Sequence, residues 1–446
     1  MRSSLHPLIL AATCGLLLSA CGGGGDGNDA DRVAATRNSY VQQTFVANRV
    51  TDYQPSVQAD ASFTDAWGIA IRPAGIPGHF WVLAGNKSFE YVGDVTGKVV
   101  APCTTASTLC ADLLTVPLTT NQVTIPDFPM TVVNGVTTTI PDTVNNHSTG
   151  VVFNGNASSF SITQHLTSSS SSPTITAGAK FLFATSFGTV AAWTEIKNPD
   201  GTYQRPDHAD TVINGGTGAG FYGIAVSPDS SKLYVADFGA QMRLRVYDSA
   251  FTEITNSLPA GAFRNPFLAS QDTADIRAGD FVPWNVQVLN GHVFVTYAQL
   301  QEDPANPGMP WPTNEVHASG AGRLVEFDVN GNLIAVWNDG GLLNAPWGMA
   351  IAPSNFGALS NTLLVGNFGD YDGDNKGAIV AFDMTTRKAV NYVRNPDGSP
   401  VLIPGIWGMV FGNGDTLGDA NTLYFASGPN DEADGVFGSL RYSPGR

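Results

Sequence analysis

The chain of 446 residues is poor in charge, in basic residues and in helical periodicity. Charged residues make up 13%, and 22 Lys and Arg stand against 38 Asp and Glu, which gives a net charge of −16. A nucleic-acid binder needs a positive surface to meet phosphates, so we predict no nucleic-acid partner. Few segments repeat apolar residues with helical spacing, which excludes a mainly helical fold. Short apolar runs between Gly, Pro, Asn and Asp remain, and these are typical of strands and turns.

Residues 1–20 carry an export signal. A run from Leu8 to Leu18 is too short to cross a bilayer comfortably, and small residues precede Cys21. The segment Leu18-Ser19-Ala20-Cys21 resembles the bacterial lipobox, which implies cleavage before Cys21 and a lipid on its thiol. The alternative is a plain signal peptide. Residues 21–39, rich in Gly and Asp, read as a flexible tether. By resemblance to sorting rules, Gly22 favours the outer membrane, with the protein facing the periplasm or the surface.

Cysteine is scarce, since the chain has four. Cys14 leaves with the signal and Cys21 is the predicted lipid site, so Cys103 and Cys110 remain. An exported chain meets an oxidising compartment, and six residues between two thiols allow a small closed loop. We therefore predict a Cys103–Cys110 disulfide that pins an insertion. A zinc site is the alternative, but no His or further Cys lies nearby in sequence.

One short motif recurs through the chain, and we call it the opening motif. Its six copies are AWGIAI from Ala66, STGVVF from Ser148, FYGIAV from Phe221, PWNVQV from Pro283, PWGMAI from Pro346 and IWGMVF from Ile406. An aromatic residue stands second in five copies, where the other has Thr149. Gly stands third in five copies, where the other has Asn285. The copies recur every ~60–80 residues, against ~40–45 for WD40-type units, so the excess must be insertions such as the Gln301–Ala318 stretch.

Further strand-like runs follow most copies and give up to four strands per unit. Examples are KLYVADFG at Lys232 and RLVEFD at Arg323. Four-stranded units repeated in a ring are typical of a β-propeller, and we predict an all-β, six-bladed propeller over residues 40–446. The last unit lacks a fourth strand, so we predict that the run from Tyr40 to Ala47 completes that blade and closes the ring.

The opening motif has a structural explanation in such a ring. It would form the innermost strand, where Gly allows backbones to approach closely. We interpret the aromatic residues, Trp67, Trp347 and Trp407 among them, as packing in the wedge between adjacent blades rather than as ligand-stacking groups.

The motifs Pro-Trp-Gly-Met-Ala from Pro346, LYVADFG and RLVEFDVNGNL resemble NHL-type propellers. From about Tyr40 onward the chain also resembles an uncharacterised, exported bacterial propeller family similar to NHL and gluconolactonase-like proteins. Residues Gly150–Asn154, Phe281–Gln287 and Val295–Ala298 carry that resemblance. It implies a propeller fold and an exported protein, but it implies no chemistry.

Two sets of residues are candidates for metal binding. Asp370, Asp372 and Asp374 alternate in GDYDGDNKG and would offer three carboxylates to one Ca²⁺, although the EF-hand pattern is not met. The alternative is a solvated acidic hairpin loop. Asp65, His147, Asn285 and Asn344 stand near the starts of the predicted inner strands and would meet at one mouth of the channel. Gluconolactonase-like enzymes bind a metal there, but their Glu-first ligand pattern is not matched.

Nucleophilic catalysis has little support. The chain has no G-x-S-x-G elbow, and His208 and His317 have no recognisable Ser or Cys partner in sequence, so both are interpreted as surface or loop residues. We therefore expect binding rather than catalysis. The leading hypothesis is an outer-membrane lipoprotein with a non-catalytic propeller that binds a ligand, a protein or a glycan. The sequence identifies no cofactor for it beyond the Ca²⁺ candidate at the acidic loop. The alternative is a metal-dependent hydrolase or lactonase with its site at the channel mouth.

Overall fold

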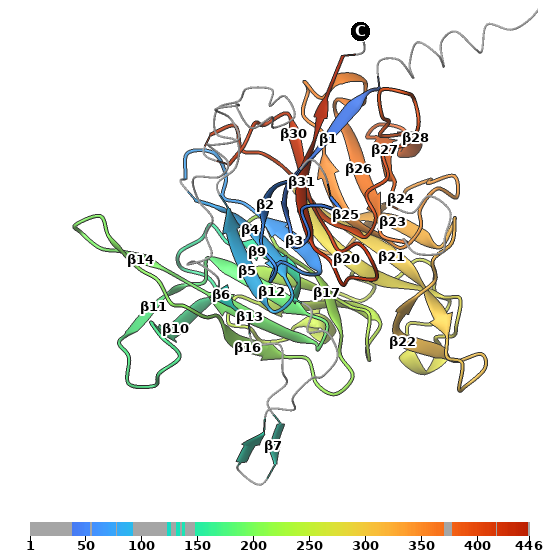
Figure 1. The fold of residues 1–446 in the computed structure, drawn as a ribbon. Coiled ribbons are helices and arrows are strands. Elements are labelled where there is room, and N and C mark those ends of the chain that lie inside the picture. The colour runs from blue at the N-terminus through green and yellow to red at the C-terminus, as the bar shows by residue number, and fades with distance from the viewer. Residues whose placement is uncertain are drawn as a thin grey trace, which may run out of the picture.

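The protein is a six-bladed β-propeller (Figure 1). The computed structural model describes residues 38–53, 56–76, 78–91, 123–125, 131–133, 136–138, 148–369, 377–415 and 417–444. The innermost strands contact one another in a closed circle that follows chain order, and the last contacts the first. The prediction of an all-β, six-bladed ring is confirmed.

The first three blades are given from the innermost strand outward. Blade 1 contains β3 (Ala66–Ala70), β4 (Phe80–Ala84), β5 (Lys87–Tyr91) and β6 (Val123–Thr124). Blade 2 contains β9 (Ser148–Phe153), β12 (Phe181–Thr185), β13 (Thr189–Trp193) and β16 (Asp210–Asn214). Blade 3 contains three strands, β17 (Phe221–Val226), β18 (Lys232–Asp237) and β19 (Arg243–Asp248).

The last three blades follow the same order. Blade 4 contains β20 (Phe281–Leu289), β21 (His292–Glu302), β23 (Gly322–Phe327) and β24 (Leu333–Val336). Blade 5 contains β25 (Pro346–Ile351), β26 (Thr362–Asn367), β27 (Ile379–Asp383) and β28 (Lys388–Tyr392). Blade 6 contains β29 (Ile406–Phe411), β30 (Thr422–Ser427), β31 (Val436–Tyr442), β1 (Tyr40–Ala47) and β2 (Ser56–Ala59).

The remaining elements lie between these strands along the chain. The described residues include three short 3-10 helices, η1 (Thr255–Ser257), η2 (Thr273–Asp275) and η3 (Gly357–Leu359). The added hairpin strands are β7 (Thr131–Val133) with β8 (Val136–Thr138), β10 (Ser161–His165) with β11 (Thr174–Gly178), β14 (Ile196–Lys197) with β15 (Tyr203–Gln204), and β22 (Pro310–Glu315), which pairs with β21. The β10–β11 hairpin and the part of the Gln301–Ala318 stretch that follows β21 are thus insertions outside the repeated units, as the spacing of the motif predicted.

The N-terminal strand closes the ring, as predicted. β1 pairs antiparallel with β31, from Tyr40 opposite Tyr442 to Ala47 opposite Val436. In Figure 1 the blue β1 lies beside the red β31. Side chains reinforce the junction, because Asp434 accepts hydrogen bonds from Asn48 Nδ2 at 2.8 Å and from the Tyr53 hydroxyl at 2.6 Å. The first and last strands of the ring are therefore held together by backbone pairing and by a shared carboxylate.

The innermost strands approach so closely that glycine is required at the third position of the opening motif. A Cβ on Gly408 would lie 2.5 Å from Trp67 O, and one on Gly68 would lie 2.7 Å from Thr149 O. Both clashes are with backbone atoms of the neighbouring inner strand, which cannot rotate away. The interpretation of this glycine as a crowding residue is confirmed.

The two departures from the motif make hydrogen bonds across the same boundary. Thr149 Oγ1 donates to Phe221 O at 2.6 Å, and Asn285 Nδ2 donates to Trp347 O at 2.7 Å. In each case the side chain reaches the inner strand of the next blade.

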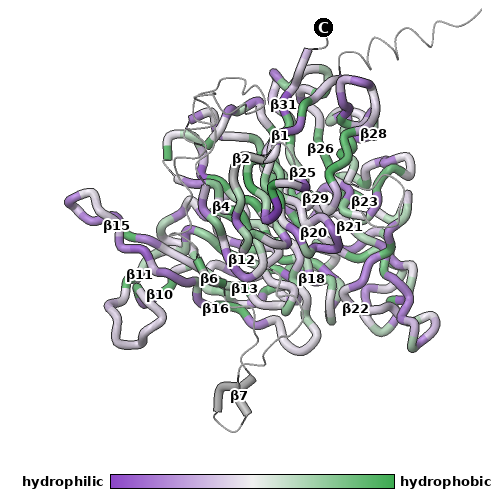
Figure 2. The backbone as a smooth tube through the Cα atoms, viewed as in Figure 1, coloured by the Kyte–Doolittle hydropathy of each residue, from purple (hydrophilic) through white to green (hydrophobic). Residues whose placement is uncertain are grey.

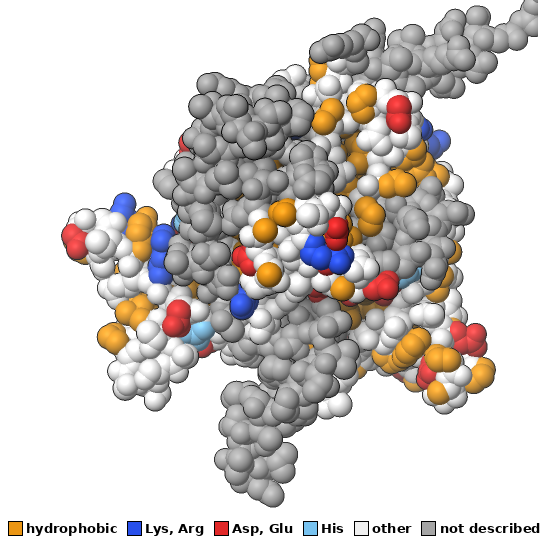
Figure 3. All heavy atoms as spheres, viewed as in Figure 1, with side chains coloured by type: hydrophobic (Ala, Val, Ile, Leu, Met, Phe, Trp, Pro, Cys, Tyr) orange, Lys and Arg blue, Asp and Glu red, His pale blue; other side chains and the backbone are white. Residues whose placement is uncertain are grey.

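Clusters of buried hydrophobic side chains join adjacent blades, for example blades 3 and 4 and blades 5 and 6. Figure 2 shows hydrophobic residues concentrated in the strands of the body, whereas the β14–β15 arm is largely hydrophilic. On the face shown in Figure 3, the Lys and Arg side chains of the described residues lie in small separate groups. Among the described residues, no helix is long and apolar enough to cross a membrane.

Candidate functional site

The aromatic residues of the opening motif meet on the ring axis. Five of them belong to one buried cluster, which we call the aromatic plug: Trp67, Tyr222, Trp284, Trp347 and Trp407. Their rings come from blades 1, 3, 4, 5 and 6. Two pairs are stacked, Trp67 on Trp407 with ring centroids 3.5 Å apart and Tyr222 on Trp284 at 4.5 Å.

The plug corrects part of the sequence interpretation. These residues are packed, with 1–8% of each exposed. The two stacked pairs join adjacent blades, 6 with 1 and 3 with 4, but other contacts of the plug join blades that are not adjacent. Trp67 in blade 1 contacts Tyr222 in blade 3 at 5.8 Å and Trp347 in blade 5 at 6.1 Å. The reason is that a narrow ring brings six equivalent positions toward one axis, so large side chains there meet across it.

The plug lies between two cavities. One, the apolar channel, has a volume of about 340 Å³ and is lined by the later residues of the inner strands, such as Ile69, Val151, Ile224 and Met409. The other, which we call the polar cup, has a volume of about 260 Å³. Its lining residues are Trp67, Ser186, Tyr222, Trp284, Thr313, Asn314, Glu315, His317, Phe368, Trp407 and Glu432.

The polar cup lies at the end of the ring where the inner strands begin. In an antiparallel blade, the connection between the second and third strands returns to that same end. Ser186, Phe368 and Glu432 follow β12, β26 and β30 respectively, and so lie in such connections. Glu315 ends β22 and belongs to the insertion of blade 4. The cup therefore has an aromatic floor from inner strands and a polar wall from loops.

The wall of the cup is acidic. Glu315 and Glu432 line it, and the described lining includes no Lys or Arg. His317 Nε2 lies 3.0 Å from Glu315 Oε1, and the His317 ring stands edge-on to Phe368 with centroids 5.6 Å apart. When Glu315 is ionised, Nε2 must carry the proton, so the imidazole donates to the carboxylate.

The negative charge of the wall affects the pKa of Tyr222, which lies in the floor of the cup. Burial raises the pKa of its hydroxyl far above the ordinary value, and the carboxylates of Glu315 and Glu432 raise it further. A raised tyrosine pKa means that a second negative charge is disfavoured at this place. Tyr222 thus stays a neutral phenol.

Two segments of the wall hold a strained backbone. Thr313 has a φ of 63°, and Asn430, Asp431 and Glu432 have φ values of 59°, 51° and 61°. A positive φ costs free energy in any residue other than Gly, and most of all in a β-branched residue such as Thr313. Such a conformation persists only where the surrounding contacts stabilise it. The strained turn places Glu432 beside Gly428: a Cβ added to Gly428 would lie 3.5 Å from Glu432 Cγ.

Three of the four predicted channel-mouth residues are described, and each makes a local contact. Asp65 Oδ1 accepts from Trp67 Nε1 at 2.6 Å, and Asn344 Nδ2 donates to Gly369 O at 3.1 Å. Asn285 Oδ1 accepts from Val286 N at 2.8 Å, and this residue borders the apolar channel. His147 lies outside the described residues. A metal-binding role for these four stays a prediction.

The other predicted sites lie outside the described residues. These are the lipidation residue Cys21, the predicted disulfide residues Cys103 and Cys110, and the acidic loop residues Asp370, Asp372 and Asp374. Within the described ranges, no group of three or more His, Cys, Asp and Glu is placed to hold a metal ion.

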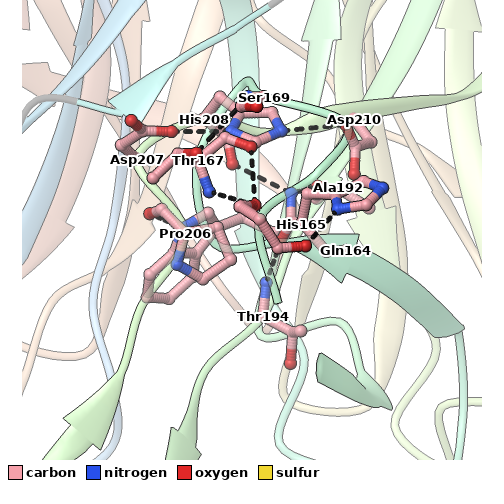
Figure 4. A network of polar contacts seen from close by, with 12 residues as sticks. Gln164, His165, Thr167, Ser169, Ala192, Thr194, Pro206, Asp207, His208 and Asp210 are labelled. Atoms are coloured by element: carbon pink, nitrogen blue, oxygen red, sulfur yellow. Dashed lines mark hydrogen bonds and ion pairs between the residues drawn. The ribbon is translucent and has the colours of Figure 1, made fainter. Parts of the chain in front are cut away.

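A second polar network lies around the β10–β11 hairpin of blade 2 (Figure 4). The buried Gln164 side chain donates to His208 O at 2.9 Å and accepts from Thr194 N at 3.2 Å. His208 contacts carboxylates on both sides, with Nδ1 2.7 Å from Asp207 and Nε2 3.3 Å from Asp210. These bonds attach the hairpin to its blade, and they place His208 in the loop before β16 with its side chain 18% exposed.

Sequence reasoning misses the polar wall of the cup. It interprets His317 as a surface or loop residue, and His317 does lie in a loop, but that loop faces the cavity. It does not single out Glu315 or Glu432. One signal in the sequence could have found part of this wall. Residues that follow the second strand of a unit lie at the end of the ring where the opening motif begins, and Ser186, Phe368 and Glu432 are such residues.

No family model matches the chain. It is similar to three uncharacterized proteins of Acanthamoeba polyphaga mimivirus: R648, 30% identical over 49% of this chain and 48% of that protein; L690, 27% identical over 53% and 56%; and R640, 28% identical over 52% and 38%. The aligned part thus spans about half the length of the first two relatives. Among solved structures, it is similar to XC5397 of Xanthomonas campestris, described as a gluconolactonase, with 13% identity, a TM-score of 0.32, and coverage of 59% of this chain and 82% of that one.

Proposed function

We propose that the protein is a non-catalytic binding propeller whose ligand site is the polar cup. The observation that carries the proposal is the aromatic plug, which makes the cup a blind pocket instead of part of an open channel. Ligand sites are typically concave and apolar, with a few polar groups that fix orientation. The cup has this composition, since indole rings form its floor and Glu315, His317 and Glu432 its wall. Its volume favours a small ligand.

The test compares binding with turnover. Purified protein is titrated with small neutral, cationic and anionic compounds, and the signal is the fluorescence of the plug tryptophans. We expect saturable binding of one class without turnover, and Glu315→Gln and Glu432→Gln should weaken it. Glu302→Gln is the matched control, because Glu302 is an exposed residue of the same blade, outside the cup.

Hydrolysis is the competing function. Turnover of glucono-δ-lactone at ordinary enzymatic rates, together with stoichiometric Ca²⁺, Mg²⁺ or Zn²⁺ by elemental analysis, would contradict the binding proposal. That result would favour the metal-dependent hydrolase or lactonase. Loss of the metal from the His147→Ala variant would then support the predicted channel-mouth site.

The cellular localisation of the protein is a separate proposal, supported by the lipobox resemblance at residues 18–21. We propose that a lipid on Cys21 anchors the propeller to the bacterial outer membrane through the tether. In the Cys21→Ala variant, the protein should become soluble or stay unprocessed. Continued membrane anchoring of this variant would contradict the proposal.

A further inference from the structure

We infer that the apolar channel, on the other side of the aromatic plug, is a second binding site. Its ligand is a small uncharged molecule with an aliphatic body and one oxygen acceptor. This inference goes beyond the proposed function of the polar cup and does not depend on it. It combines the shape of the channel, the chemistry of its described lining and one amide donor, Gln287 Nε2.

The channel is a pocket rather than a passage. Its volume of about 340 Å³ falls within the range of small-molecule pockets, about 300–1,000 Å³. Trp347 belongs both to the plug and to the lining of the channel, so the plug closes one end. Most of the other lining residues belong to the later parts of the inner strands. The opening therefore lies at the end of the ring where the inner strands finish.

The lining contains no Asp, Glu, Lys, Arg or His among the described residues. Aliphatic side chains such as Ile69, Val151, Ile224, Met409 and Val410 border the cavity. Each inner strand is the terminal strand of its sheet, so its free edge adds backbone N–H and C=O groups, which are polar but uncharged. Moving a charged group from water into such a site is costly without an opposite charge, whereas burying aliphatic surface is favourable. The lining therefore selects against ions and favours an uncharged aliphatic molecule.

Two amide side chains line the channel, Asn285 and Gln287. Asn285 uses both ends of its amide, because Nδ2 donates to Trp347 O at 2.7 Å and Oδ1 accepts from Val286 N at 2.8 Å. Gln287 uses one end, because Oε1 accepts from Met349 N at 2.7 Å and the described residues provide no acceptor for Nε2. The Gln287 side chain is partly exposed, and Nε2 is not among the buried unpaired atoms, so a ligand can reach it.

The bond to Met349 determines which end of the Gln287 amide is available. A backbone N–H needs an acceptor, so the amide oxygen faces Met349 N and the NH₂ group is left for another partner. A donor in an apolar site is stabilised by an acceptor, and a ligand with a carbonyl or hydroxyl oxygen provides one. Gln287 Nε2 would thus hold the ligand oxygen while the aliphatic body packs against the lining.

The decisive experiment compares two probes of nearly the same shape, heptan-2-one and hexanoate. Both have a pentyl chain and a carbonyl group, but the methyl group of the ketone is replaced by a charged oxygen in hexanoate. Binding to the full mature protein is followed by isothermal titration at about pH 7, where a carboxylic acid is ionised. We expect heptan-2-one to bind saturably and hexanoate at least about tenfold more weakly, because only hexanoate must bury a charge.

Variants assign the binding to the channel. Gln287→Met keeps the length of the side chain and removes the amide donor, so it should weaken heptan-2-one binding about three- to tenfold. Gln301→Met is the matched control, because Gln301 is an exposed residue of the same blade, outside the channel lining. It should leave binding unchanged, and so should Glu315→Gln in the cup. Circular dichroism confirms folding of each variant, and the comparison of the two probes on the unaltered protein does not depend on the variants.

The contrary outcomes separate this inference from the function of the cup. Equal binding of heptan-2-one and hexanoate, or no binding of heptan-2-one up to its solubility limit, would overturn the inference. Binding that is unchanged in Gln287→Met, or that is weakened by Glu315→Gln, would place the site outside the channel and also overturn it. The cup is tested with its own ligands, so each of these results leaves its proposed function standing.

Discussion

The contact between neighbouring inner strands makes Gly408→Ala a sharp test of the ring. An added Cβ would lie 2.5 Å from Trp67 O, 2.9 Å from Ile69 N and 3.2 Å from Gly68 C. Ordinary contact begins at 3.4 Å, so β29 and β3 would have to separate by roughly 0.9 Å at the closest point, an overpacking strain. All three atoms are backbone, so no side-chain rotation relieves the clash. The separation also disturbs the Trp67–Trp407 stack at 3.5 Å.

The expected change in the free energy of unfolding of Gly408→Ala follows from two opposing effects. Overpacking a close contact costs about 1–3 kcal/mol. Replacing Gly by Ala restricts the unfolded chain and returns about 0.4–1 kcal/mol. We therefore expect a net loss of about 1–2 kcal/mol in the free energy of unfolding. Urea titration followed by tryptophan fluorescence measures it as a lower midpoint with an unchanged slope.

Gly155→Ala is the matched control for this measurement. Gly155 is exposed, its φ is not in the left-handed region, and the nearest atom to an added Cβ is Phe153 Cε1 at 3.5 Å, which is ordinary contact. It should be neutral or stabilised by up to about 1 kcal/mol. If Gly408→Ala and Gly155→Ala unfold at the same urea concentration, the crowding argument for the opening motif is wrong.

Three further predictions concern polar groups that join blades or close the ring. Asn285→Ala removes the bond to Trp347 O at 2.7 Å and should lower the free energy of unfolding by about 1–3 kcal/mol in a urea titration; a neutral result would mean that this bond does not hold blades 4 and 5 together. Burial raises the pKa of Glu195, but Arg72 and Arg205 outweigh it and hold the pKa below its usual 4.5, so the stabilisation is present above pH 4.5 and is lost as pH falls through the folded-state pKa. Glu195→Gln should therefore cost roughly 3 kcal/mol at about pH 7, since it removes the negative charge that faces the buried Arg72, and the difference from the unaltered protein should shrink in urea titrations at lower pH; a pH-independent difference would refute the ion-pair explanation. Asp434→Ala removes the acceptor shared by Asn48, Arg49 and Tyr53 and should speed limited proteolysis after residue 48, whereas unchanged cleavage would show that β1 pairing alone closes the ring.

The repeated motif is enough to establish the number of blades, the inner strands and the closure of the ring. These follow from local patterns, because a strand that must approach its neighbours closely needs Gly at a fixed place in each copy, and a sheet edge needs a partner. The role of Gly68 and Gly408 is therefore readable from the amino-acid sequence, and so is the pairing of Tyr40–Ala47 with the last blade. The insertions are also visible there as excess spacing.

The meeting of the aromatic side chains and of the acidic residues depends instead on the tertiary structure. Trp67 and Trp407 stack although 340 positions separate them, and Glu315 and Glu432 share a cavity although one lies in an insertion of blade 4 and the other in a turn of blade 6. The motif specifies each strand but not the radius of the ring, and that radius decides whether large side chains pack between blades or across the axis. The path of each loop depends on its own contacts, such as the strained turn that carries Glu432, and these do not repeat from one unit to the next.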